Sequence, residues 1–144
     1  MRINDVIAGK GTDVLTVKPD ASVRDLLGAL AEHNVGALVV SADGTSVDGI
    51  VSERDVVRHL HRDEGVLDAA VSTIMSSPVR TCEGHHTVDE LMVLMTERRF
   101  RHVPVVKDDA LIGIVSIGDV VKSRISELEF ERDQLDSYVQ SGQT

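Results

Sequence analysis

The sequence Gly49-Ile50-Val51-Ser52-Glu53-Arg54-Asp55-Val56-Val57 decides the fold, because it returns as Gly113-Ile114-Val115-Ser116-Ile117-Gly118-Asp119-Val120-Val121. The two copies are 64 residues apart (113 − 49), and seven of their nine positions are identical. Each copy predicts a buried strand that runs into the start of a helix, with a Ser and an Asp where the strand ends. Two equivalent polar sites on a duplicated scaffold indicate a binding module with twofold pseudo-symmetry rather than a single catalytic centre.

The residues around the two copies predict two units, each with the element order β-α-β-β-α. The first unit is expected to contain strands over 14–17, 36–40 and 47–51, and helices after Ser22 and over 53–61. The second unit repeats this pattern at an offset of 65 residues (81 − 16) before its hairpin, where Thr81 matches Thr16, and of 64 residues after it. The predicted fold class is therefore α/β, with two pseudo-twofold-related units packed together and an extended C-terminal helix.

This pattern divides the chain into four segments. They are a first unit over residues 1–62, a linker with a short helix over 63–77, a second unit over 78–125 and a C-terminal helical extension over 126–144. Short helical segments around Ile3 and Ile74 lead into the first and the second unit, respectively.

The C-terminal helix is where we expect another subunit to bind. Its sequence has no Pro and no Gly from 120 to 140, and five apolar residues follow an a/d-like spacing: Val121, Ile125, Leu128, Leu135 and Val139. Twenty residues at a rise of about 1.5 Å reach about 30 Å, beyond the edge of a small domain. We therefore predict a homodimer, and a helix that caps its own domain is the alternative.

The composition is that of an acidic globular protein with an aliphatic core, with 42% hydrophobic and 2% aromatic residues and a net charge of −9. This charge disfavours non-specific binding to nucleic acid and to anionic lipid, so neither is an expected partner. Cys82 is the only cysteine, which excludes an intramolecular disulfide and an all-thiolate zinc site. The first residues lack an apolar signal-peptide region, and no apolar run approaches about 18 residues, so we expect a cytoplasmic protein with no membrane span.

The repeated serine and aspartate have two readings. Ser52 and Ser116 suit the N-cap of a helix, and Asp55 and Asp119 then fall in the first helical turn, where the helix dipole stabilises a carboxylate. Capping explains either copy taken alone. The Ser-x-x-Asp spacing recurs although the two residues inside it change, and this favours a binding function as well. Such a carboxylate can accept two hydrogen bonds from a ribose diol, and the hydroxyl with helix N–H groups can hold a phosphate.

The doubled Gly-Ile-Val-Ser-x-x-Asp segment, the β-α-β-β-α order and the sequence Arg101-His102-Val103-Pro104-Val105-Val106 resemble a tandem pair of CBS domains, also called a Bateman module. The resemblance runs from about residue 2 to 125 and is similar to small stand-alone bacterial CBS-pair proteins. It implies a non-catalytic regulatory sensor of adenine nucleotides, with two pseudo-symmetric clefts between the units.

The resemblance also implies roles for particular residues. Asp55 and Asp119 would hold ribose hydroxyls, and Ser52 and Ser116 would hold ribose or phosphate. Thr16 and Thr81, in the first strands, would border adenine. Arg101 and His102, before the second strand, would meet phosphates. The first unit has Gly36 and Ala37 in place of the last two, so we expect the two sites to differ in affinity or ligand.

Two further residues complete the candidate site. Arg54 would supply charge to the first site, with an exposed helix arginine as the alternative. Pro104 lies inside a strand pattern and cannot donate to a ladder, which predicts an edge strand or an interrupted position beside a cleft.

AMP is the ligand that we favour, because a net charge of −9 disfavours polyphosphates unless the cleft is locally basic. NAD(H) is the second choice, and the resemblance also allows ADP, ATP and S-adenosylmethionine. No metal is expected, since no histidine spacing matches a metal site. The rival hypotheses are a constitutive dimerisation scaffold without bound nucleotide and, more weakly, a hydrolase that uses Ser116 and His102. The sequence does not identify the regulated protein partner.

Overall fold

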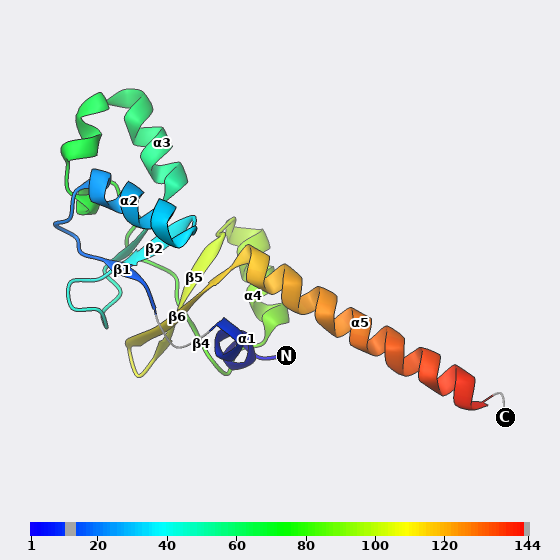
Figure 1. Ribbon diagram of the computed structural model, residues 1–144. Helices are drawn as coiled ribbons and strands as arrows, with labels where there is room; N and C mark the ends of the chain where they lie inside the picture. The colour runs from blue at the N-terminus through cyan, green and yellow to red at the C-terminus, as the bar shows by residue number, and fades with distance from the viewer. Residues whose placement is uncertain (11–13, 143–144) are drawn as a thin grey trace.

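The computed structural model describes residues 1–10 and 14–142 and contains two three-stranded sheets with helices around them (Figure 1). In the first sheet β1 (Thr16–Val17) pairs parallel with β2 (Ala37–Val40), and β2 pairs antiparallel with β3 (Gly49–Ser52). The second sheet repeats this order with β4 (Cys82–Glu83), β5 (His102–Lys107) and β6 (Ala110–Ser116). The predicted α/β fold of two related units is confirmed.

The helices complete the repeat. Helices α2 (Val23–His33) and α4 (Val88–Arg98) each connect the first two strands of a unit, and α3 (Glu53–Arg62) and α5 (Ile117–Gly142) each follow its last strand. Helix α2 begins after Ser22, whose side chain accepts from the backbone N–H of Asp25 at 3.0 Å. The N-cap that the sequence predicted at Ser22 is therefore present, and Thr87 caps α4 in the same way.

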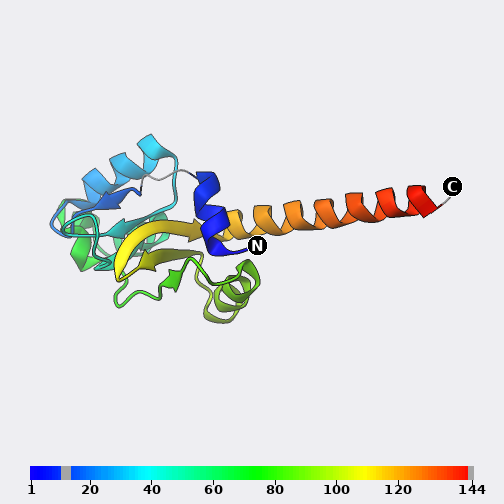
Figure 2. The same cartoon turned by 90° about the horizontal axis from the view of Figure 1, so that it is seen from below.

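Each unit packs against the segment that leads into the other one. Helix α1 (Ile3–Lys10) lies beside the base of α5 in both views (Figures 1 and 2), and its Ile3 is fully buried in the core of the second unit. The short 3₁₀ helices η1 (Glu64–Asp68) and η2 (Val71–Thr73) pack instead against the first core. The predicted segment boundaries remain predictions. Each core contains residues of one unit and of the segment that leads into the other unit, so the two cores share the chain crosswise.

Pro104 lies in the central strand of the second sheet, so the expectation of an edge strand is wrong. It stands opposite Ile114 of β6, whereas β4 pairs with β5 only at Val105 and Val106. The side of β5 that faces β4 is therefore unpaired at the proline, which is the interrupted position that the sequence also allowed.

Helix α5 extends away from the body of the molecule (Figures 1 and 2). Its 26 residues correspond to about 39 Å at a rise of about 1.5 Å per residue. Val120 and Ser123 at its base are buried against the second unit, while Val121, Leu128 and Leu135 are 48%, 49% and 65% exposed. Within residues 1–10 and 14–142 there is no helix that is long and apolar enough to span a membrane.

Candidate functional site

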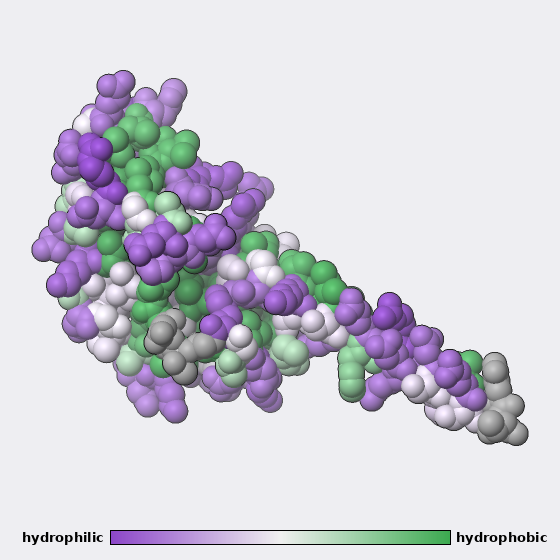
Figure 3. Space-filling view, in the orientation of Figure 1, coloured by the Kyte–Doolittle hydropathy of each residue, from purple (hydrophilic) through white to green (hydrophobic). Residues whose placement is uncertain are grey.

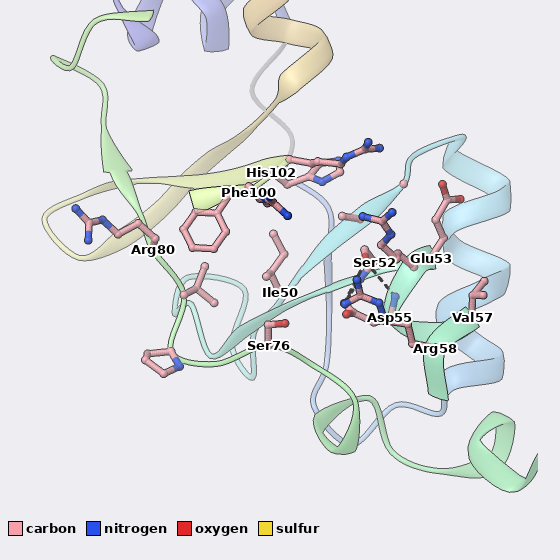
Figure 4. Close-up of a pocket in the computed structure, with 17 residues that line it drawn as sticks. Ile50, Ser52, Glu53, Asp55, Val57, Arg58, Ser76, Arg80, Phe100 and His102 are labelled. Carbon is pink, nitrogen blue, oxygen red and sulfur yellow. Dashed lines mark hydrogen bonds between the residues drawn. The ribbon is translucent and has the colours of Figure 1, made fainter. Parts of the chain in front are cut away.

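A pocket of about 640 Å³ lies between the two units (Figure 4). The first unit supplies the end of β3 and the first turns of α3, and the other wall comes from residues 78–80 and 99–102. Figure 4 shows Phe100 on one side and Ser52 and Asp55 on the other, with Ile50 between them. The pocket therefore depends on the packing of the two units against each other.

Ser52 and Asp55 cap α3 reciprocally at this pocket. The backbone N–H of Asp55 donates to Oγ of Ser52 at 3.2 Å, and the backbone N–H of Ser52 donates to Oδ2 of Asp55 at 2.9 Å. The capping function that the sequence suggested is thus present. These bonds engage Oδ2, and the carboxylate has a second oxygen that can accept from a ligand hydroxyl.

The lining of the pocket is basic, although the chain as a whole carries a charge of −9. Five arginines and two acids line it, namely Arg54, Arg58, Arg80, Arg99 and Arg101, with Glu53 and Asp55. Guanidinium groups bind phosphates and carboxylates through paired, charge-assisted hydrogen bonds. The pocket is therefore suited to an anionic ligand, and the argument from net charge against several phosphates does not hold locally.

His102 lies at the start of β5, between this pocket and the end of β6, where it stands opposite Ser116. Burial lowers the pKa of His102, and the positive charges of Lys10 and Arg101 lower it further, against the opposing effect of Asp119. The imidazole is therefore neutral at pH 7 and can offer a ligand a hydrogen bond but no charge.

The second Ser-x-x-Asp segment makes the same cap but does not line this pocket. The backbone N–H of Ser116 donates to Oδ2 of Asp119 at 2.8 Å, and the N–H of Asp119 donates to Oγ of Ser116 at 3.1 Å. The ammonium of Lys10 lies 2.7 Å from the same carboxylate oxygen. The hydroxyl of Ser116 thus acts as a helix cap, which gives no support to its use as a nucleophile.

Half of the ten predicted site residues line the pocket: Ser52, Arg54, Asp55, Arg101 and His102. The other five are Thr16, Thr81, Pro104, Ser116 and Asp119, which lie outside it. Thr16 and Thr81 are half-buried and Pro104 is buried in β5. The sequence analysis grouped Arg101 and His102 with Ser116 and Asp119 of the second unit. In the structure Arg101 and His102 instead line the pocket that contains Ser52 and Asp55 of the first unit.

Among the pocket residues that were not predicted as site residues are Arg58, Arg80, Arg99 and Phe100. Helical periodicity contains the signal for Arg58, which is one turn beyond Arg54 on the same face of α3. Arg99 belongs to a basic cluster with Arg98 and Arg101, which is compatible with phosphate binding. No local pattern places Arg80 or Arg99 beside Ser52, however, because they arrive through the packing of the second unit against the first.

Metal and thiol chemistry find little support elsewhere in the molecule. Among the residues that the structure describes, no group of three or more His, Cys, Asp or Glu side chains could hold a metal ion. Cys82 is buried in the second core, and burial raises the pKa of its thiol to about 11. A thiol in such surroundings is not activated as a nucleophile.

Comparison with known proteins agrees with the repeat. The family model described as "CBS domain" matches the chain twice, at residues 5–62 and 71–126. A mitochondrial CBS domain-containing protein of Arabidopsis thaliana, CBSX3, is 37% identical over 149 residues, which cover 97% of this chain and 72% of that protein.

Two solved structures are similar to the whole body of the molecule. The CBS-domain containing protein ATU1752 from Agrobacterium tumefaciens has a TM-score of 0.82 at 45% identity, covering 86% of this chain and 99% of the other. The structure of CBSX2 in complex with AMP has a TM-score of 0.73 at 27% identity, covering 87% of this chain and 96% of the other.

Proposed function

The chain belongs to the CBS-domain family as a tandem pair, and from this premise we propose that it is a non-catalytic regulatory module that binds an adenine nucleotide between its two units. The observation that carries the proposal is the pocket in which Ser52 and Asp55 of one unit face the arginines of loop 99–101 of the other. The likeness to CBSX2, which was solved with AMP, supports the same ligand class here.

The proposed roles follow from the geometry of the pocket. The second carboxylate oxygen of Asp55, which the helix cap does not use, would accept hydrogen bonds from the ribose hydroxyls. Phosphate oxygens would bind the guanidinium groups of Arg99 and Arg101 from one side and Arg58 from the other. Phe100, which is 38% exposed, offers a ring face for stacking against the base.

The proposal also concerns which adenine nucleotide binds and how many phosphates it carries. AMP remains our choice, and ADP, ATP and NAD(H) fit the same five-arginine lining, which removes the electrostatic argument against them. S-adenosylmethionine carries a sulfonium cation, and the same arginines disfavour it.

Binding would act on the arrangement of the two units. Since the pocket has walls from both units, a nucleotide there would favour the packed arrangement over more open ones, and a partner protein could respond to the shift. We propose the cytoplasm as the location, because the free buried thiol of Cys82 suits a reducing compartment.

A homodimer through α5 is the second part of the proposal. Figure 3 shows hydrophobic side chains over the base of this helix, where Ile117, Val121 and Ile125 line a shallow groove. The exposed apolar seam continues to Val139, with Arg132 at the one spaced position that is not apolar. Counting Arg132, the seam positions are symmetric about position 130, since 121 + 139, 125 + 135 and 128 + 132 all equal 260.

This symmetry favours two antiparallel helices. In a parallel pair Arg132 would lie against the Arg132 of the second copy, which is unfavourable. In an antiparallel pair it would lie against Leu128 of the second copy, with Glu129 and Glu131 of that copy nearby. The same exposed seam also favours the alternative function, a dimerisation scaffold that holds no nucleotide.

Thermal-shift measurements on nucleotide-free protein test the proposal with AMP, ADP, ATP, NAD⁺, NADH and S-adenosylmethionine. A ligand at about 100 times its Kd adds about 2.7 kcal/mol, which moves the Tm by several degrees. Asp55→Asn should remove the shift, and Asp20→Asn, at an exposed aspartate outside the pocket, should retain it. A protein that dimerises but shifts with none of these ligands would instead support the scaffold.

A further inference from the structure

The two Ser-x-x-Asp segments share their capping contacts but differ in what else the aspartate touches. Asp55 lines the open pocket. Oδ2 of Asp119 accepts a hydrogen bond from the Lys10 ammonium at 2.7 Å, and the same ammonium donates to the carbonyl oxygen of Ile114 at 2.8 Å. A cation of the chain itself thus bridges the end of β6 and the start of α5, at the carboxylate that a ligand of the second cleft would need.

Lys10 is held at this position by the docking of α1. Ile3 is fully buried in the second core, and its backbone N–H donates to the carbonyl oxygen of His86 at 2.9 Å. The backbone N–H of Asn4 donates to the carbonyl oxygen of Gly84 at 2.9 Å. Because α1 is a continuous helix that ends at Lys10, these contacts at its first turn also set the position of its last turn, from which the Lys10 side chain reaches Asp119.

The charge of Lys10 lowers the pKa values of two neighbouring residues, Asp119 and His102. Burial raises the pKa of Asp119, but hydrogen bonds from Lys10 and Ser116 and the charge of Lys10 bring it below its ordinary value. The charge of Lys10 also adds to the effect of burial in lowering the pKa of His102. The charge of Lys10 therefore lowers the pKa of Asp119, in the second Ser-x-x-Asp segment, and of His102, which lines the first pocket.

Resting on the proposed nucleotide function, we propose that Lys10 determines how many nucleotides the chain binds. The first pocket takes one nucleotide at Asp55, whereas at Asp119, where the pseudo-symmetry of the two units implies a second site, the carboxylate already binds the ammonium of Lys10. A nucleotide reaches Asp119 only by displacing the ammonium, so its affinity there is at least tenfold lower. The duplicated motif thus yields one high-affinity site per chain, and the first helix selects which one.

Isothermal titration with AMP as the probe tests this inference. We expect one high-affinity equivalent per chain for the wild type and two of similar affinity for Lys10→Met, which keeps an aliphatic side chain but removes the charge. Lys10→Arg should retain one equivalent. Lys107→Ala removes an exposed lysine at the far end of β5 and should also retain one. Circular dichroism and Tm confirm that each variant is folded.

Two variants at Asp119 test whether the second AMP equivalent of Lys10→Met binds at that residue. Asp119→Asn alone should leave the single equivalent of the wild type unchanged, whereas adding it to Lys10→Met should return the count from two to one. Two equivalents of similar affinity in the wild type, or one in Lys10→Met, would overturn the inference while leaving the proposed function intact. An absence of binding in every variant would overturn both.

Discussion

Asn34 and Arg99 end the equivalent helices α2 and α4 with the same left-handed backbone, at φ 53° and 57°. Asparagine tolerates this region, whereas arginine is disfavoured there. The second unit therefore keeps an unfavourable residue at a position that lines the pocket. Strained residues of this kind cluster at binding sites, where the side chain is needed for another purpose.

The first prediction concerns Arg99. Arg99→Asn should leave the Tm unchanged or raise it slightly, because asparagine suits the left-handed backbone, and it should weaken AMP binding about tenfold through loss of a charge-assisted hydrogen bond. Titration calorimetry and thermal unfolding give the two values. Arg98→Gln, one residue away and outside the pocket, is the matched control. A variant with a lower Tm and undiminished binding would contradict the assignment.

The second prediction concerns pH and His102. Its pKa is lowered in the folded state, so the unfolded state takes up the proton first, and stability present above the ordinary pKa of about 6.5 is lost as pH falls through the folded pKa. The Tm should decrease between pH 7.5 and 5.5, and His102→Gln should flatten that decrease. His85→Gln, at an exposed histidine, should not. Equal slopes in all three proteins would count against a buried neutral His102.

The third prediction concerns the docking of α1. A Cβ at Gly84 would overlap the side-chain amide of Asn4, which is exposed and can rotate away, so Gly84→Ala should destabilise the protein by about 1 kcal/mol or less. Gly9→Ala is a contrasting change, since a Cβ there meets nothing within 4 Å, and it should stabilise α1 by about 0.5–1 kcal/mol. Urea unfolding measures both. The double variant Asn4→Ala/Gly84→Ala should recover most of the loss, and no recovery would place the clash elsewhere.

The fourth prediction concerns Cys82. With a pKa of about 11 in a buried position, the thiol should react with a disulfide reagent far more slowly in the native protein at pH 8 than in urea. Absorbance of the released thiolate gives both rates, and Cys82→Ala provides the blank. Rapid labelling without denaturant would show that the second core opens readily.

The fifth prediction concerns α5. Light scattering should give twice the chain mass of 15.6 kDa for the wild type, and the monomer mass for Leu128→Glu/Leu135→Glu. Gln134→Glu adds charge to the exposed helix off the seam and should remain dimeric. In a Cys82→Ala background, antiparallel helices should crosslink in Val121→Cys/Val139→Cys but not in Val121→Cys alone. Crosslinking of the single variant would indicate a parallel pair.

The sequence predicts most of the fold because local patterns specify the elements of each unit, and the second unit repeats the patterns of the first. Periodicity and the repeat at Ser52 and Ser116 give the elements of both units, and the cap at Ser22 gives the start of α2. The site is predicted only in part, since contacts across the units leave no periodic signal. Arg80 reaches the pocket from a segment with no regular structure, and Lys10 reaches Asp119 across 109 residues.

The crosswise sharing of the two cores has a consequence for the order in which the protein acquires its structure during synthesis. Every buried residue of the first core has been synthesised once Ile74 is added, whereas the second core joins Ile3 to Val115 and Val120. At about 5–20 residues per second, the roughly 40 residues between these points take about 2 to 8 s. During that interval α1 has no sheet to pack on, and the apolar side of this early helix is exposed to chaperones and to neighbouring nascent chains.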